Sequence, residues 1–321
     1  MAMSKRLPEL RPVDPELVPR VYEPADRRVG HLLQRWDGRP SSWRLYAVAL
    51  IGFPSDEGVR RNQGRSGAAE APREIRRWLY RMSPGAGLAL WERTLDLGDL
   101  MLSGDLEADR QRLADVVAAL LAEGLLPVVL GGGHETAFGH FLGYVQAARA
   151  VSILNVDQHL DVRPLRPEGP HSGSPFREAL EHPSGLLRQY RVVGAQRQAV
   201  APHHEAYLRQ HGGLIHWFEE MDPGEDWAFL EETPSPILVS FDLDAVQQAD
   251  APGVSAPSPV GFSARWAIAF ARRCGAHPAV SSFELVECAP PLDRDGQTAR
   301  LAALMVWSFV QGLAERRGEK G

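Results

Sequence analysis

The chain has 321 residues, with 35 basic and 41 acidic side chains and a formal net charge of −6. Hydrophobic residues make up 44% and charged residues 24%, which is ordinary for a globular protein and excludes a largely disordered chain. Basic residues form no stripe and no apolar run reaches about 18 residues, so we expect neither a nucleic-acid partner nor a membrane span. The two cysteines, Cys274 and Cys288, are too few for a disulfide framework and are typical of a cytoplasmic protein.

Residues 1–42 are rich in Pro, Arg, Asp and Glu and show little periodicity. They predict an irregular arm on the surface, ahead of a domain that covers residues 43–321. The N-terminus lacks an apolar signal core, so we expect no standard secretion signal. The length allows about two domains at roughly 150 residues each, but α/β folds of this size often form one body, which is our expectation.

From Leu45 onward, short apolar segments alternate with longer amphipathic ones. The apolar segments predict strands that are covered on both faces, over residues 45–53, 94–97, 126–130, 151–156, 191–193, 213–216, 237–241 and 279–285. The amphipathic segments predict helices over residues 68–81, 105–123, 134–148, 202–210, 263–274 and 297–317. This alternation predicts an α/β fold with a mostly parallel sheet, whose ligands bind outside the carboxyl ends of the strands.

Three of the predicted strands end in side chains that commonly bind metals. In extended backbone, alternate side chains point to the same face, so ligand-type residues spaced by two converge. The candidates are His134 after the strand at 126–130, Asp157, His159 and Asp161 after the strand at 151–156, and Asp242 and Asp244 after the strand at 237–241. A lone Asp-x-Asp is more often solvated or a helix cap, so the prediction depends on the coincidence of three such strand ends.

Four carboxylates packed together without cations would repel one another and raise each other's pKa, whereas two divalent cations balance their charge. Oxygen ligands with some imidazole and no thiolate favour Mn²⁺, although they do not exclude Zn²⁺, Fe²⁺ or Co²⁺. Two such ions roughly 3.5–4 Å apart activate water near neutral pH, which predicts a metal-dependent hydrolase. No GxSxG motif is present, and Cys288 lies in an apolar stretch that favours a buried, inert thiol.

Three segments resemble, in the right order, the metal signatures of the arginase, agmatinase and formimidoylglutamase family, the ureohydrolases: Gly131–Glu135, Asp157–Asp161, and Ser240–Asp244 followed by Ala251–Pro257. The resemblance covers residues 45 to 315. It implies one α/β/α domain around an eight-stranded parallel sheet, two manganese ions and a homo-oligomer, commonly a trimer or hexamer. It also implies one ion held by His134, Asp157, Asp161 and Asp242 and another by Asp157, His159, Asp242 and Asp244, so that Asp157 and Asp242 bridge.

The stretch Phe283–Pro290 resembles a family segment whose glutamate pairs with the substrate amidinium, and that position falls on Glu287. The loop at 56–68 and the segment 172–177 look like the formimidoylglutamase versions. Ser172 stands where arginases and agmatinases carry a histidine, which leaves open whether Ser172 or the adjacent His171 takes part in proton transfer.

Arg163 occupies the place where arginases have an asparagine that touches the substrate carboxylate. An arginine there suits an anionic substrate, because its guanidinium can bind a carboxylate through two hydrogen bonds. The loop residues Arg60, Arg61 and Asn62, together with Ser172, are the further candidates for substrate binding.

The resulting hypothesis is hydrolysis of N-formimidoyl-L-glutamate to L-glutamate and formamide, a step of histidine breakdown. Asp161 would carry a proton to the leaving amine, and Glu287 would stabilise the charged tetrahedral intermediate. One alternative is an agmatinase or guanidino-acid ureohydrolase that releases urea. An alternative of another class is a metal-binding but inactive subunit.

Overall fold

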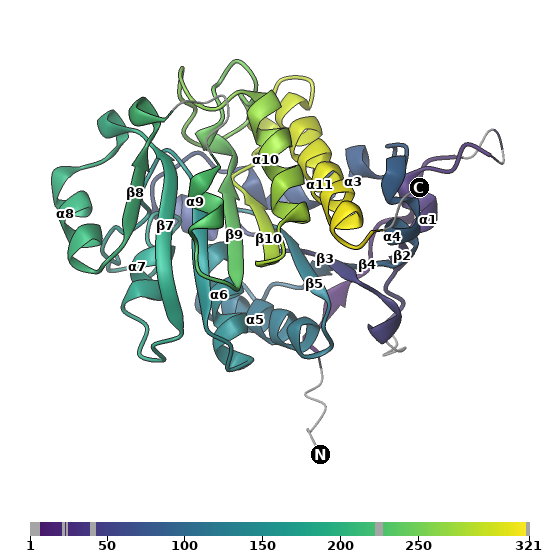
Figure 1. The fold of residues 1–321 in the computed structure, drawn as a ribbon, viewed down its shortest axis with the longest axis horizontal. Helices are drawn as coiled ribbons and strands as arrows, with labels where there is room; N and C mark the ends of the chain where they lie inside the picture. Colours follow the sequence, from purple (N-terminus) through teal and green to yellow (C-terminus); the bar gives the residue numbers. More distant parts are fainter. Residues whose placement is uncertain (1–6, 21–22, 24, 39–42, 222–226, 319–321) are drawn as a thin grey trace.

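The computed structural model describes residues 7–20, 23, 25–38, 43–221 and 227–318. These residues form one ten-stranded sheet in the order β1-β4-β3-β5-β10-β9-β6-β7-β8, with β2 also paired to β4 (Figure 1). Every pairing is parallel except that of β1 with β4. The strands are β1 (Leu10–Arg11), β2 (Gln34–Arg35), β3 (Val48–Gly52), β4 (Thr94–Leu100), β5 (Leu126–Leu130), β6 (Val151–Val156), β7 (Leu187–Ala195), β8 (Leu214–Trp217), β9 (Ile237–Asp242) and β10 (Val280–Val286).

The eight strands predicted from apolar segments are all present as β3 to β10. The two additional strands, β1 and β2, have two residues each and come from the N-terminal segment. They are too short to show the alternation that marks a strand in a sequence. The α/β class and the mostly parallel sheet are therefore confirmed, with two more strands than expected.

The six predicted helices correspond to α3, α5, α6, α8, α10 and α11. Asp105 caps α5, because its side chain accepts a hydrogen bond of 3.0 Å from the Ala108 N–H. The unpredicted helices have at most six residues, which is too short for a helical period to be seen. The helices are α1 (Val29–Leu32), α2 (Glu57–Arg61), α3 (Ala71–Leu79), α4 (Leu88–Glu92), α5 (Leu106–Ala122), α6 (Thr136–Gln146), α7 (Pro175–Leu180), α8 (Pro202–Gln210), α9 (Ala228–Glu231), α10 (Ala264–Ala276) and α11 (Gln297–Arg316).

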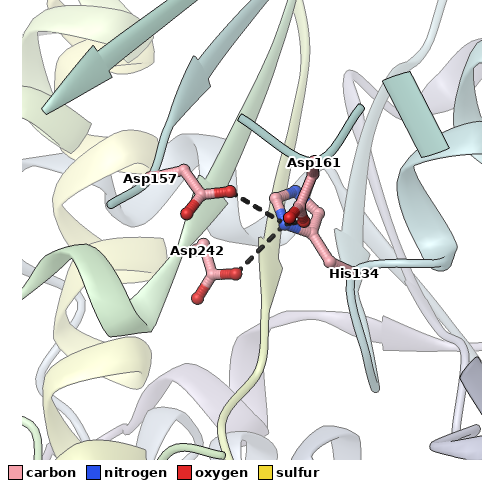
Figure 2. A group of neighbouring side chains, drawn as sticks. All are labelled: His134, Asp157, Asp161 and Asp242. Carbon is pink, nitrogen blue, oxygen red and sulfur yellow. Dashed lines mark ion pairs between the residues drawn. The ribbon is translucent and has the colours of Figure 1, made fainter. Parts of the chain in front are cut away.

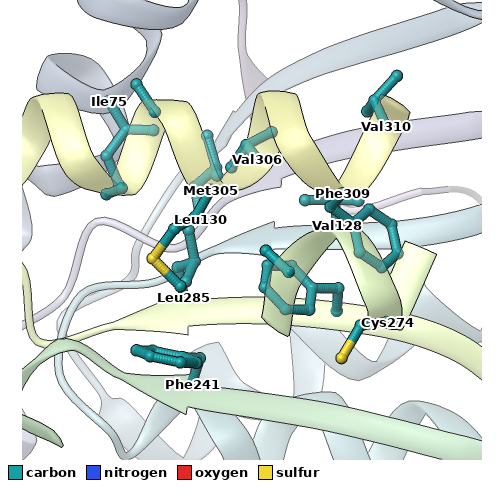
Figure 3. Packing of buried hydrophobic residues seen from close by; sticks show 14 of the residues in the cluster. Ile75, Val128, Leu130, Phe241, Cys274, Leu285, Met305, Val306, Phe309 and Val310 are labelled. Atoms are coloured by element: carbon teal, nitrogen blue, oxygen red, sulfur yellow. The ribbon is translucent and has the colours of Figure 1, made fainter. Parts of the chain in front are cut away.

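The sheet separates two apolar cores, because successive side chains of a strand point to opposite faces. In β3, Val48 and Leu50 join one core while Ala49 and Ile51 join the other. Residues of α3, α10 and α11 complete the first core and residues of α5 and α6 the second. Figure 3 shows the first of these interfaces, where Met305 and Phe309 of α11 lie over the strands. Both faces of the sheet are thus covered, as the charge-poor strands predicted.

The N-terminal segment differs from the surface arm that its composition predicted. Val13, Leu17, Val29 and Leu32 are buried and join the core on the α3 side, and β1 extends the sheet edge. These apolar residues are separated by prolines and charged residues in short elements, so they show no period in the sequence. Residues 1–6, 21–22, 24 and 39–42 of the predicted arm lie outside the described residues.

None of the helices formed by the described residues is long and apolar enough to cross a membrane.

Candidate metal centre

The predicted ligands meet because four neighbouring strands end at the same edge of the sheet. In the order β5-β10-β9-β6, His134 follows β5, Glu287 follows β10, Asp242 ends β9 and Asp157 follows β6. Parallel strands present their carboxyl ends side by side, so residues more than 100 positions apart in sequence become neighbours. This edge is where the rule for parallel sheets places a ligand.

The first ligand set surrounds the imidazole of His134 (Figure 2). Its Nδ1 atom lies 3.0 Å from Oδ2 of Asp161, 3.0 Å from Oδ2 of Asp242 and 3.3 Å from Oδ2 of Asp157. All four side chains are buried. One nitrogen and three carboxylate oxygens from three separate segments therefore converge on one point.

The second set is formed by Asp157, His159 and Asp244. Nδ1 of His159 lies 3.4 Å from Oδ1 of Asp157 and 3.2 Å from Oδ2 of Asp244. Asp157 thus directs one carboxylate oxygen to each set, as a bridging ligand does. Asp242 belongs to the first set alone in this geometry, and its role as a second bridge stays a prediction from the family resemblance.

Local backbone geometry follows from the Asp-x-His and Asp-x-Asp sequences themselves. Oδ1 of Asp157 accepts the His159 N–H at 2.6 Å, and Oδ1 of Asp242 accepts the Asp244 N–H at 2.8 Å. These are Asx-type turns, in which an aspartate bonds the backbone two residues later. Asp161 has φ = 47°, a left-handed conformation that aspartate tolerates better than most residues. The alternation of side chains expected for extended backbone therefore holds for only part of this segment. A turn at Asp161 brings its carboxylate into the first ligand set.

The glycines before His134 are required by close packing. A Cβ atom on Gly132 would lie 1.7 Å from the carbonyl oxygen of Ser55, and the Gly133 N–H donates to that same oxygen at 2.9 Å. The loop that carries His134 is consequently pressed against the residues that follow β3.

The donor atoms of both sets suit divalent cations. Among the described residues, His134 Nδ1 and Asp244 Oδ1 are buried and have no hydrogen-bond partner. Burial raises the pKa of Asp242 well above its ordinary value, and the charges of Asp244 and Asp157 raise it further. Burial alone would lower the pKa of His134, but the three carboxylates around its ring raise it well above normal. Two cations at these sets would satisfy the orphaned atoms and balance the carboxylates.

Glu287 is fixed to the loop that carries His134. Its Oε1 atom accepts the His134 N–H at 2.8 Å, and its own N–H donates to the Gly132 carbonyl at 2.8 Å. The residue is buried and has φ = 66°, a strained conformation of the kind often found at functional sites. Burial, followed by the negative charge of Glu135, raises the pKa of Glu287 to about 8.

Beside the metal ligands, three predicted substrate residues form one hydrogen-bonded row. Arg163 Nη1 donates to Asn62 Oδ1 at 3.2 Å, and Asn62 Nδ2 donates to Ser172 Oγ at 3.1 Å. No carboxylate of the described residues forms an ion pair with Arg163, which is half-buried. Its guanidinium is therefore a partly buried cation that no carboxylate in the described part of the chain pairs with.

The two arginines of α2 are directed elsewhere. Arg60 bonds Glu57 through two nitrogens and leaves 68% of its side chain exposed. Arg61 pairs with Glu57 and Glu107 and also donates to the Pro170 carbonyl. The guanidinium groups of Arg60 and Arg61 are therefore already paired with carboxylates.

His171 is engaged in holding its own loop. Its Nδ1 atom accepts the Gly173 N–H at 3.1 Å, and Nε2 lies 3.1 Å from the Pro164 carbonyl, which only an N–H can bond. Burial lowers the pKa of this imidazole. Both ring nitrogens are thus used by backbone groups, whereas the hydroxyl of Ser172 belongs to the row with Asn62.

Sequence reasoning missed a set of buried polar residues behind the ligands. Asn155 Nδ2 donates to Asp157 Oδ2 at 3.2 Å and to the Tyr190 hydroxyl at 3.1 Å, and Tyr190 donates to the Leu160 carbonyl at 2.9 Å. Another group, Ser240, Glu284 and His140, lies behind His134. The available signal was the presence of polar residues inside strands that are otherwise apolar.

These observations define a class of protein: an α/β metalloprotein with two adjoining carboxylate–histidine sets at the carboxyl edge of a parallel sheet. The model of the arginase family matches residues 46–311. A formimidoylglutamase from Geobacillus thermodenitrificans is 39% identical over 270 residues, which cover 80% of this chain and 81% of that protein. The formimidoylglutamase of Aeromonas hydrophila is 35% identical over 325 residues, covering 94% and 99% of the two chains.

A solved structure of formiminoglutamase from Trypanosoma cruzi with Mn²⁺ matches with a TM-score of 0.82 and 33% identity, covering 91% of this chain and 99% of that one. The chain belongs to the arginase family.

Proposed function

We propose that this protein is a binuclear manganese hydrolase that converts N-formimidoyl-L-glutamate and water to L-glutamate and formamide. The observation that carries the proposal is the pair of ligand sets that share Asp157. The relatives named above support the substrate, since the two bacterial proteins and the trypanosomal one bear that activity in their names. Histidine breakdown is the corresponding metabolic setting.

In the proposed mechanism, His134, Asp157, Asp161 and Asp242 would hold one ion, and Asp157, His159 and Asp244 would hold the other. When bound, a pair of manganese ions activates water for attack at neutral pH and offsets negative charge in the transition state.

Glu287 and Asp161 then act on the substrate itself. The Glu287 carboxylate faces the same edge as the ligands and pairs with the amidinium, which keeps the carbon that is attacked electrophilic. Asp161 accepts a proton from the attacking water and transfers it to the nitrogen of the leaving amine as the C–N bond breaks, so that glutamate departs as a neutral amine. These two carboxylates come from the loops after β6 and β10, on opposite sides of β9 in the sheet.

Recognition of the glutamate part of the substrate falls to Arg163, with Asn62 and Ser172. The guanidinium of Arg163 has no protein counter-charge among the described residues and is already oriented by Asn62. A substrate carboxylate can accept two parallel hydrogen bonds from it. A cationic substrate such as agmatine would meet like charge at this point.

The product distinguishes this function from its alternatives. Manganese-reconstituted protein is incubated with formimidoylglutamate, arginine, agmatine and guanidinobutyrate, and both formamide and urea are assayed. We expect formamide from formimidoylglutamate alone. Urea from a guanidino compound would contradict the substrate while retaining the metal centre, and no product from any compound would favour an inactive metal-binding subunit.

We also propose that the protein acts in the cytoplasm as a homo-oligomer. Both cysteines are free and buried, as suits a reducing compartment, and the assembly follows the resemblance to a family of trimers and hexamers. Light scattering of the purified chain measures the assembly, and a monomer at micromolar concentration would contradict it.

A further inference from the structure

A chain of buried polar groups leads away from the first ligand set into the core between the sheet and α6. His134 Nε2 lies 2.9 Å from Ser240 Oγ, and Ser240 Oγ donates to Glu284 Oε1 at 2.6 Å. The other oxygen of Glu284 lies 2.8 Å from His140 Nδ1. Ser240 and Glu284 are direct cross-strand partners on β9 and β10. All four side chains are at most 1% exposed.

The directions of these hydrogen bonds determine the tautomer of His134. A serine hydroxyl has one hydrogen, and Ser240 donates it to the Glu284 carboxylate. Ser240 must then accept from His134, so Nε2 carries the ring hydrogen. In the neutral ring this leaves the lone pair on Nδ1, which is the atom that faces Asp157, Asp161 and Asp242.

The position of Glu284 is costly unless it serves such an interaction. A carboxylate buried in an apolar layer is stable only when it is fully hydrogen-bonded or paired. Glu284 is surrounded on its face of the sheet by the apolar core of α5 and α6, and it forms hydrogen bonds with Ser240 and His140. A carboxylate behind a ligating imidazole orients the ring and makes it a stronger donor to the metal.

Within the described part of the chain, the second ligand set has no equivalent hydrogen-bonded support. His159 leaves 22% of its side chain exposed, and its imidazole contacts the carboxylates of the ligands Asp157 and Asp244. We propose that Glu284, acting through Ser240, is a positioning residue that selectively tightens the metal site of His134. The inference rests on the proposed binuclear centre but is independent of the proposed substrate.

The test is a titration of metal-free protein with Mn²⁺ alone, in which the electron paramagnetic resonance signal reports free Mn²⁺. We expect wild-type protein to take up two ions. Glu284→Gln keeps the shape of the side chain and removes its charge. It should lower the affinity for one Mn²⁺ ion by about 10–100-fold and leave the affinity for the other unchanged. In a His134→Ala background, Glu284→Gln should have no further effect, because the ring it orients is absent.

Further variants separate positioning from general damage. Ser240→Ala breaks the chain while Glu284 keeps His140, so it should reproduce the selective loss even if Glu284→Gln does not fold. Ser240→Thr retains the hydroxyl and should restore affinity. Ser282→Ala is a matched control. Ser282 is a buried serine on β10, the strand that carries Glu284, but its hydroxyl bonds Tyr144 instead of the groups behind His134.

Two outcomes would overturn the inference: unchanged binding of both ions in Ser240→Ala and Glu284→Gln, or equal weakening of both ions. Wild-type protein that binds fewer than two ions would contradict the proposed metal centre itself, so the two failures are distinguishable.

Discussion

The metal edge and the substrate side of the site are built in different ways. The ligands stand on or directly after β5, β6 and β9, and strand pairing across the sheet sets their separations. The substrate side consists of the loop and short helix after β3 and the segment from Arg163 to Ser174. These segments are held to each other by single hydrogen bonds, such as that from the Ser172 N–H to the Gly58 carbonyl.

This difference separates the residues that bind metal from the residues that select the substrate. The positions of residues at strand ends are fixed by many contacts within the sheet. The metal centre therefore tolerates changes elsewhere in the chain. The positions of loop residues are fixed by only a few contacts. Changing one arginine in a loop therefore alters which substrate fits. Variants should therefore divide into those that abolish turnover and those that mainly alter KM.

The largest effect is expected for Asp161→Asn at the metal edge. The amide keeps the size of the side chain but cannot accept and transfer the proton, and it is a weaker metal ligand. We expect kcat to fall by roughly 10³-fold or more at saturating manganese. Steady-state kinetics measure this, and turnover close to that of the wild type would refute the assigned role.

On the substrate side, Arg163→Ala should raise KM for formimidoylglutamate by roughly 10–100-fold, the effect of losing a charge-assisted hydrogen bond. Manganese uptake should stay at the wild-type level. Arg188→Ala is the control, because Arg188 lies near the start of β7, at the edge opposite the metal ligands, and bonds the Ser235 carbonyl. Loss of kcat with KM unchanged would contradict a binding role for Arg163.

Gly58→Ala tests whether the two regions are mechanically joined. The Gly58 N–H donates to Glu135 Oε1 at 2.8 Å, and an added Cβ would lie 2.4 Å from Glu135 Cδ and 2.7 Å from Glu135 Cβ. The loop must shift at a cost of about 1–3 kcal/mol. We expect KM to rise on the order of tenfold. A fall in manganese affinity instead would show that the loop supports the metal edge.

The smallest effect is expected for the pH dependence of the stability of the metal-free protein. Burial first, and then other charges, raise the pKa of Glu287 to about 8, and burial raises that of Glu135 to about 7. Folding therefore favours their protonated forms, and this stability is present below about pH 4.5 and is lost as the pH rises through 7 and 8. The melting temperature of chelator-treated protein should fall between pH 5 and 8.

Manganese should reverse this trend, because metal binding to deprotonated ligands strengthens as the pH rises. The gap in melting temperature between manganese-loaded and chelator-treated protein should widen over the same range. A gap that narrows toward pH 8 would contradict this linkage.

The metal ligands could be predicted from sequence because their spacing is local. Asp157, His159 and Asp161 lie within five residues, and the strand before them is a continuous apolar run. That parallel strands end together is a general rule, so three such runs predict a single site. The helices of nine or more residues were predicted for the same reason, since their periodicity is visible over several turns.

The remaining features depend on contacts that no local pattern encodes. Glu284 meets Ser240 only because β10 pairs with β9 in one register, and His140 reaches Glu284 from α6. Arg60 and Arg163 look alike in sequence, but Arg60 lies three residues after Glu57 on a short helix and pairs with it. Distinguishing such residues requires the three-dimensional arrangement.

The most direct test of the two ligand sets that share Asp157 is anomalous diffraction from crystals of the wild-type protein grown with manganese. We expect two manganese peaks, one contacted by His134 and Asp161 and the other by His159 and Asp244, with the carboxylate of Asp157 between them. A single peak, or a peak away from this edge of the sheet, would contradict it.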